Sequence, residues 1–170
     1  MSDKILIAYA TKAGSTAEVG EAIGQELRDA GAQVDVRLAK DVKDVSPYKA
    51  MIVGSAIRMG KLLSDATKFV EKKRKALSQV PVSYFVVCLT MQDDTEENRR
   101  TVEAYLDPVR EMVEPVEVGL FPGALNCDKL GFPWGPMMRR AKDEFPEGDY
   151  RDWEAIRAWA RQVHGLLTQG

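Results

Sequence analysis

The sequence predicts a doubly wound α/β fold, in which helices cover both faces of a five-stranded parallel sheet. Strand-like apolar runs alternate with helical runs along the 170 residues, and this alternation is typical of βαβ crossovers. The run 82–89 is apolar nearly throughout, as a parallel strand buried on both faces should be. A hydroxyl-rich turn also joins the first strand to the first helix, at the place where such sheets bind ligands.

The predicted strands are short apolar runs, and the first begins almost at the start of the sequence. They lie near residues 4–9, 33–38, 50–55, 82–89 and 116–121. Only residues 39–49 separate the second strand from the third, so we expect a short crossover with a single helical turn there. The length of the chain suits one domain spanning 1–170.

The predicted helices carry apolar residues at spacings of three and four, which places one apolar stripe along each helix. They lie near residues 16–30, 64–78, 95–113 and 151–167. The third is the clearest example, because its stripe consists of Val102, Tyr105, Leu106, Val109, Met112 and Val113.

A long segment, 122–150, separates the fifth strand from the last helix and is rich in glycine and proline. Its apolar and aromatic residues make it unlike a linker, so we interpret it as an insertion. It could be a lid, a partner surface or, through 130–142, a peripheral contact with a membrane. The alternative is a loop that folds its own apolar side chains onto the edge of the domain.

Composition and charge exclude several classes of protein. The net charge of −2 argues against a nucleic-acid partner, which normally requires a basic surface. No apolar run approaches the roughly 20 residues of a transmembrane helix, and we expect no signal peptide. Cys88 and Cys127 form no CxxC pair, and His164 has no ligand-like neighbours, so no metal site is predicted. We therefore expect a soluble cytoplasmic protein.

The turn after the first strand has the residues of a phosphate site. Thr11, Ser15 and Thr16 supply hydroxyls around Gly14, and a helix N-terminus presents backbone N–H groups and a positive dipole end. Neither a dinucleotide fingerprint nor a Walker loop is present, which favours a single phosphomonoester. The alternative is an ordinary helix start with Ser15 or Thr16 as its N-cap.

Five positions of this region match the flavodoxin signature, and the chain therefore resembles a flavodoxin. The matching residues are Ile7, Tyr9, Thr11, Gly14 and Thr16. The resemblance implies a flavodoxin-like sheet with strand order 2-1-3-4-5 and FMN as the cofactor. It also implies that the FMN phosphate is held by Thr11, Lys12, Ala13, Gly14, Ser15 and Thr16.

The same resemblance implies that two later loops hold the isoalloxazine ring. The first follows the third strand and contributes Ser55, Ala56, Ile57, Arg58, Met59 and Gly60. The second follows the fourth strand and contributes Thr90, Met91, Gln92 and Asp93. Neither loop contains the tryptophan or tyrosine that is common in flavodoxins acting as electron carriers.

The stretch from Ser55 to Gly60 looks like that of the flavodoxin-like protoporphyrinogen oxidases, which pass electrons to menaquinone. Pro122-Gly123-Ala124-Leu125 and the later Asp152-Trp153 extend this likeness, although Met59 replaces an aromatic residue frequent in that family. The resemblance implies an FMN-dependent oxidoreductase of heme biosynthesis, with a porphyrinogen substrate and a quinone or other redox partner. An electron carrier without a small-molecule substrate, and a docking module without cofactor, are the alternatives.

Arg58 is the one candidate for a catalytic role. Beside the pyrimidine edge of the flavin, its guanidinium would stabilise the anionic reduced ring or pair with a substrate carboxylate. The alternative is a surface arginine that bridges to Asp93 or Asp94, which contributes at most about 1 kcal/mol.

Overall fold

The computed structural model describes residues 4–11, 14–58, 60–125, 148–149 and 151–167. Five parallel strands form the central sheet in the order β2-β1-β3-β5-β6, which confirms the predicted order 2-1-3-4-5. Their bounds are β1 Lys4–Ala10, β2 Gln33–Leu38, β3 Tyr48–Arg58, β5 Val82–Cys88 and β6 Glu117–Pro122.

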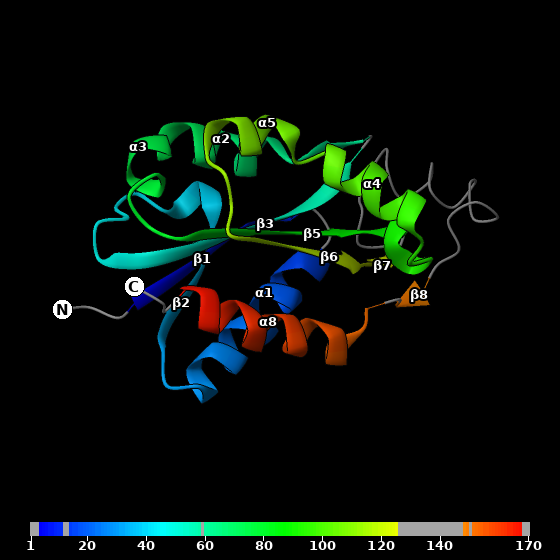
Figure 1. The fold of residues 1–170 in the computed structure, drawn as a ribbon, viewed down its shortest axis with the longest axis horizontal. Helices are drawn as coiled ribbons and strands as arrows, with labels where there is room; N and C mark the ends of the chain where they lie inside the picture. Colours follow the sequence, from blue (N-terminus) through cyan, green and yellow to red (C-terminus); the bar gives the residue numbers. More distant parts are fainter. Residues whose placement is uncertain (1–3, 12–13, 59, 126–147, 150, 168–170) are drawn as a thin grey trace.

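Helices cover both faces of this sheet (Figure 1), as the sequence predicts. One face carries α1 (Ser15–Asp29) and α8 (Trp153–Leu167), while the other carries α2 (Ser64–Lys72), α3 (Arg74–Leu77), α4 (Glu96–Ala104) and α5 (Asp107–Met112). None of the helices within the described ranges is long and apolar enough to cross a membrane.

The remaining elements of the fold are short. They are η1 (Ala39–Asp41), β4 (Lys61–Leu62), η2 (Leu89–Gln92), β7 (Ala124–Leu125) and β8 (Gly148–Asp149).

Two predicted helices are each divided in two, so the expectation of single helices over 64–78 and 95–113 is wrong. The first breaks at Lys73, where the backbone leaves the helical region at φ −101° and ψ 11°. The second breaks between α4 and α5, where Pro108 lies in the first turn of α5 and has no N–H to continue the ladder. The apolar stripe survives this break, because Val102, Leu106 and Val109 are all buried.

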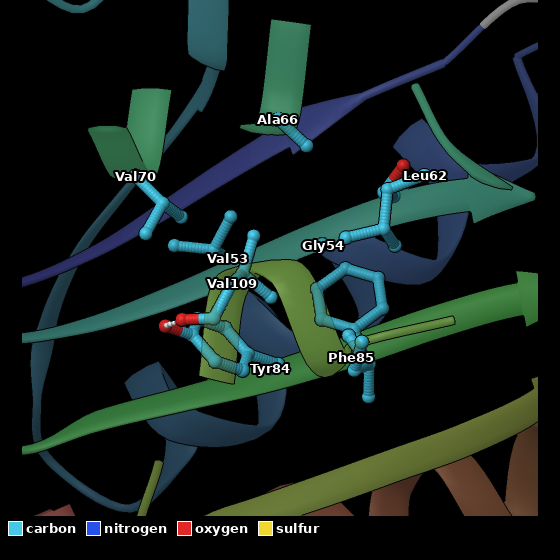
Figure 2. A pocket seen from close by; sticks show the side chains of 10 residues that line it. Val53, Gly54, Leu62, Ala66, Val70, Tyr84, Phe85 and Val109 are labelled. Carbon is cyan, nitrogen blue, oxygen red and sulfur yellow. Dashed lines mark hydrogen bonds between the residues drawn. The ribbon is translucent and has the colours of Figure 1, made fainter. Parts of the chain in front are cut away.

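The centre of the sheet is filled by an aromatic side chain that requires glycine on the neighbouring strand β3. Phe85 on β5 lies in register with Gly54 on β3 and Gly119 on β6. A Cβ atom placed on Gly54 would lie 2.0 Å from Phe85 Cζ, and Figure 2 shows the ring lying against this glycine. Phe85 also packs against Phe121 and Trp159, with ring centroids 6.4 and 6.3 Å away. Side chains are therefore excluded from position 54.

Candidate functional site

A hydrogen bond between Thr11 and Gly14 spans the turn that leads from β1 into α1. The Gly14 N–H donates to Thr11 Oγ1 at 2.9 Å, and Gly14 adopts a left-handed φ of +90°. Gly14 is also the N-cap of α1, and no side chain caps the helix. The expectation of Ser15 or Thr16 as the N-cap of this helix is therefore wrong.

Thr16 carries a hydroxyl that the protein leaves unsatisfied. The residue is fully buried, and its Oγ1 has no hydrogen-bond partner. A buried polar group without a partner costs about 1–3 kcal/mol, so such a group asks for an explanation. An oxygen-rich ligand at this helix start would remove the penalty, so the turn fits a phosphate group. Two other described side chains, Ser83 and Trp159, have buried polar atoms without a partner, but neither lies at this turn.

The first predicted ring-binding loop is a β-hairpin. Strand β3 continues three residues beyond the predicted 50–55 and pairs with β4, with Ile57 opposite Leu62 and Arg58 opposite Lys61. Gly60 lies in the turn with φ +72°, a conformation that favours glycine. The hairpin holds Ile57 and Arg58 on paired backbone rather than on an irregular loop.

The Ser55 side chain closes the base of this hairpin. Its hydroxyl donates to the Ala56 carbonyl at 2.7 Å and accepts from the buried Leu63 N–H at 3.0 Å. Ser55 itself is buried. The hydroxyl predicted to face the cofactor therefore has protein partners already, and it links β3 to the start of α2.

Arg58 lies half-buried at the end of β3. Burial lowers the pKa of its guanidinium, which still carries its charge at neutral pH. Of the two carboxylates that the alternative interpretation offers to Arg58, Asp94 binds Arg99 bidentately, through Nε and Nη2. This interaction with Arg99 lowers the pKa of Asp94.

The second predicted loop folds as η2 at the end of β5. Met91, predicted as an apolar contact for the ring, has only 2% of its surface exposed and packs into the core above the sheet. Asn98 Nδ2 donates to the carbonyls of Thr90 and Asp93, at 3.2 and 2.8 Å, and fixes the backbone of the loop. Thr90 is partly exposed and Asp93 is exposed, whereas Met91 lies in the core beneath the loop.

Several residues of the predicted site and of the predicted insertion lie outside the residues that the structure describes. Lys12, Ala13 and Met59 lie outside the described residues, and so do Cys127 and residues 130–142 of the predicted insertion. The side chains of Ser15 and Gln92 also lie outside the description, although their backbones belong to α1 and η2.

One residue near the turn was missed by the sequence analysis. Arg151, just before α8, forms an ion pair with Glu18 in the first turn of α1. Its guanidinium also lies over the Trp153 ring, 4.7 Å from the centroid. Since the two ion-pair partners are 133 positions apart in the sequence, no local pattern could have indicated this contact.

A cavity between the sheet and α2 and α5 is too small to be the binding site. It encloses about 10 Å³, which is hardly room for one water molecule. Figure 2 shows Val53, Val70, Tyr84 and Val109 around it. In the part of the chain that the structure describes, no three histidine, cysteine or acidic side chains gather where they could hold a metal ion. The turn at Thr11–Thr16 is therefore the best-supported candidate site.

Comparison with known families decides the assignment of the fold. The flavodoxin domain family matches residues 6–148, which is most of the chain. The chain belongs to the flavodoxin domain family. Solved flavodoxins share its fold along nearly the full length. One from the domain Archaea has a TM-score of 0.59 and 18% identity, and the comparison covers 98% of this chain and 99% of that one.

Another solved relative contains the cofactor expected from the sequence. A Fusobacterium nucleatum flavodoxin mutant bound to flavin mononucleotide has a TM-score of 0.59 and 14% identity, with 99% of both chains covered.

Two relatives of known sequence are named protoporphyrinogen IX dehydrogenase (quinone). The Escherichia coli protein is 24% identical, with 98% of this chain and 97% of its own length covered. The Leishmania major protein is 27% identical, with 97% of this chain and 76% of its own length covered.

Proposed function

We propose that this flavodoxin-family protein is an FMN-binding oxidoreductase built as one domain over residues 1–170. The observation that carries the proposal is the fully buried Thr16 hydroxyl without a protein partner, at the turn where α1 begins. A phosphate oxygen would give this hydroxyl the partner that it lacks. The family match and the FMN-bound relative support the same cofactor.

Three segments of the proposed site would contact different parts of the cofactor. Residues 11–16 would hold the phosphate with hydroxyls and with backbone N–H groups at the start of α1. The hairpin with Ala56, Ile57, Arg58 and Gly60 would lie along the ring, together with Thr90 and Asp93 from the η2 loop. FMN, when bound, supplies the electron-transfer chemistry, and the protein supplies position and charge.

Arg58 is the residue we propose for a direct part in the reaction. Its charge is partly withdrawn from water, so it interacts more strongly with a neighbouring anion than a fully solvated arginine would. It would offer two parallel N–H donors either to the cofactor ring or to a substrate carboxylate.

We propose protoporphyrinogen IX as the electron donor and a quinone as the acceptor. The names of the Escherichia coli and Leishmania major relatives support this assignment, and both comparisons cover nearly all of this chain. The protein would then act in heme biosynthesis in the cytoplasm, with 130–142 as the proposed contact with the membrane that holds the quinone.

An anaerobic reduction assay tests the proposed reaction. The FMN-loaded protein is mixed with protoporphyrinogen IX, and flavin absorbance and porphyrin fluorescence are followed together. We expect the flavin to bleach as fluorescent porphyrin appears, and a soluble menaquinone analogue to restore the flavin colour. The Arg58→Met variant should bind FMN but bleach at least about tenfold more slowly, by the loss of one charge-assisted contact.

The second candidate is an electron carrier, which the full-length likeness to solved flavodoxins favours. This function would be established instead if protoporphyrinogen IX does not reduce the FMN-loaded protein but a flavodoxin reductase exchanges electrons with it. Protein that stays colourless with added FMN would contradict both and leave a docking module.

A further inference from the structure

Two ion pairs connect α1 to α8, which lie side by side on one face of the sheet (Figure 1). Arg151 pairs with Glu18 near the starts of both helices. Further along, Arg161 Nη1 lies 3.5 Å from Glu26 Oε2. The second pair lies about 12 Å further along α1, because eight residues separate the two glutamates.

The first pair lies beside the proposed phosphate turn. The Glu18 N–H donates to the Gly14 carbonyl at 3.4 Å, so Glu18 is one helical turn from the N-cap. The Arg151 side chain is only 10% exposed and lies over the Trp153 ring, whereas the Glu18 side chain is 55% exposed. The positive charge is therefore fixed and poorly solvated, while the carboxylate beside it can turn toward solvent.

An unneutralised carboxylate in the first turn of α1 would compete with a phosphate for the same positive field. Acidic side chains in this position interact favourably with the helix dipole, and a phosphate monoester carries nearly two negative charges at neutral pH. The two anions repel each other, and salt weakens this repulsion because the Glu18 side chain is 55% exposed. A phosphate site with Glu18 in its first turn thus needs a compensating cation.

We propose that Arg151 is this cation: by pairing with Glu18 it neutralises the first turn of α1 and lets the turn accept a dianionic phosphate. Arg151 is a positioning residue, because it acts through Glu18 and the field of the turn. The inference rests on the proposed FMN site and adds a residue from the far end of the chain to it.

The test compares ligands with and without a phosphate. The purified protein and its Arg151→Met variant are titrated with FMN and with riboflavin, following flavin fluorescence at low and high salt. We expect the variant to bind FMN about five- to tenfold more weakly at low salt, and less so at high salt. Riboflavin affinity should stay within about twofold, because riboflavin has no phosphate to repel.

A matched variant separates charge from packing. Arg161→Met removes the other ion pair between the same helices, so its affinity for FMN should equal that of the parent protein. The double variant Glu18→Gln/Arg151→Met should recover FMN affinity to within about twofold of the parent, since no unpaired carboxylate remains.

Each alternative result has a distinct meaning. Equal FMN affinity in the parent and in Arg151→Met would overturn the inference and leave the proposed function intact. An equal loss for FMN and riboflavin, or no recovery in the double variant, would show a packing role and would also overturn it. Failure of the parent protein to bind FMN would instead contradict the proposed function.

Discussion

Two buried hydroxyls at the carboxyl edge of the sheet have opposite environments. Ser55, at the base of the β3–β4 hairpin, donates one hydrogen bond and accepts another from the protein. Thr16, at the start of α1, is equally buried and has no partner. Both were predicted from the sequence to face the cofactor. The comparison teaches that two hydroxyls with nearly the same burial can differ in their hydrogen bonds: the Ser55 hydroxyl has its partners within the protein, whereas the Thr16 hydroxyl has none, as the proposed phosphate contact requires.

The difference has an energetic consequence. Removing the Ser55 hydroxyl would leave the buried Leu63 N–H group without an acceptor. Removing the Thr16 hydroxyl breaks no hydrogen bond within the protein, because this hydroxyl has no partner there. A substitution at Ser55 should therefore affect folding and spare binding. A substitution at Thr16 should do the reverse, and the predictions below test this contrast from the largest effect to the smallest.

The strand that carries Ser55 should be the most sensitive to an added atom. Gly54→Ala would place its Cβ 2.0 Å from Phe85 Cζ, so the buried ring or the paired backbone of β3 would have to shift. We expect a loss of about 3 kcal/mol in the free energy of unfolding, measured by urea denaturation.

Gly165→Ala is the matched control for this change. Beyond its chain neighbours and the nearby backbone of helix α8, no atom lies within 4 Å of the added Cβ, and the residue is inside that helix. This variant should be stabilised by about 0.5–1 kcal/mol. Equal effects of the two glycine substitutions would contradict the packing described for the centre of the sheet.

Ser55→Ala should be the second largest effect. The buried Leu63 N–H loses its acceptor, so we expect a loss of about 2 kcal/mol in the free energy of unfolding. The FMN affinity should stay near that of the parent protein. Ser78→Ala is the control, because the Ser78 hydroxyl donates to Arg74 O at an exposed site, and its loss should cost under about 0.5 kcal/mol. A large drop in FMN affinity in Ser55→Ala would contradict the structural role assigned to Ser55 and its difference from Thr16.

The smallest effect is expected at the opposite edge of the sheet. Asp35 accepts a hydrogen bond from Tyr48 Oη at 2.7 Å, and this bond, aided by Lys4, lowers the pKa of the carboxyl group. Because the pKa is lower in the folded protein, the carboxylate stabilises the fold at neutral pH, and this contribution is lost as the pH falls through the folded value.

Asp35→Asn should therefore cost under about 1 kcal/mol at pH 7, by the usual worth of a partly exposed pair. The difference from the parent protein should shrink below about pH 4, where aspartate begins to protonate in the unfolded chain. Urea denaturation at both pH values measures this. A difference that grows on acidification would contradict the assigned interaction, and FMN affinity should be unchanged throughout.

Much of the fold follows from local patterns in the sequence. Alternating apolar runs and helical stripes predict the five strands of a parallel sheet with helices on both faces, and the resemblance to flavodoxins implies their order. The breaks at Lys73 and near Pro108 were missed because the apolar stripe continues across them. The hairpin could have been expected, since only two residues separate Arg58 from Lys61 and the second is Gly60.

The site is less predictable, because partners distant in the sequence decide what each side chain does. The turn around Gly14 was recognisable, and so was Thr16 within it. Nothing local shows that the Ser55 hydroxyl accepts from the N–H of Leu63, or that Met91 turns inward. The contact between Arg151 and Glu18 depends on two helices meeting, and only the three-dimensional structure brings them together.

The most direct test of the account is a calorimetric titration of the protein with FMN, for the parent and for Thr16→Val. We predict that the parent binds FMN, and that the variant binds it about 10–100-fold more weakly, as expected for one lost bond to a charged group. The free energy of unfolding of the variant without FMN should be equal to that of the parent or higher, because an unsatisfied hydroxyl has been removed. Equal FMN affinities in the two proteins, or a destabilised variant, would contradict the claim that the Thr16 hydroxyl binds the phosphate of FMN.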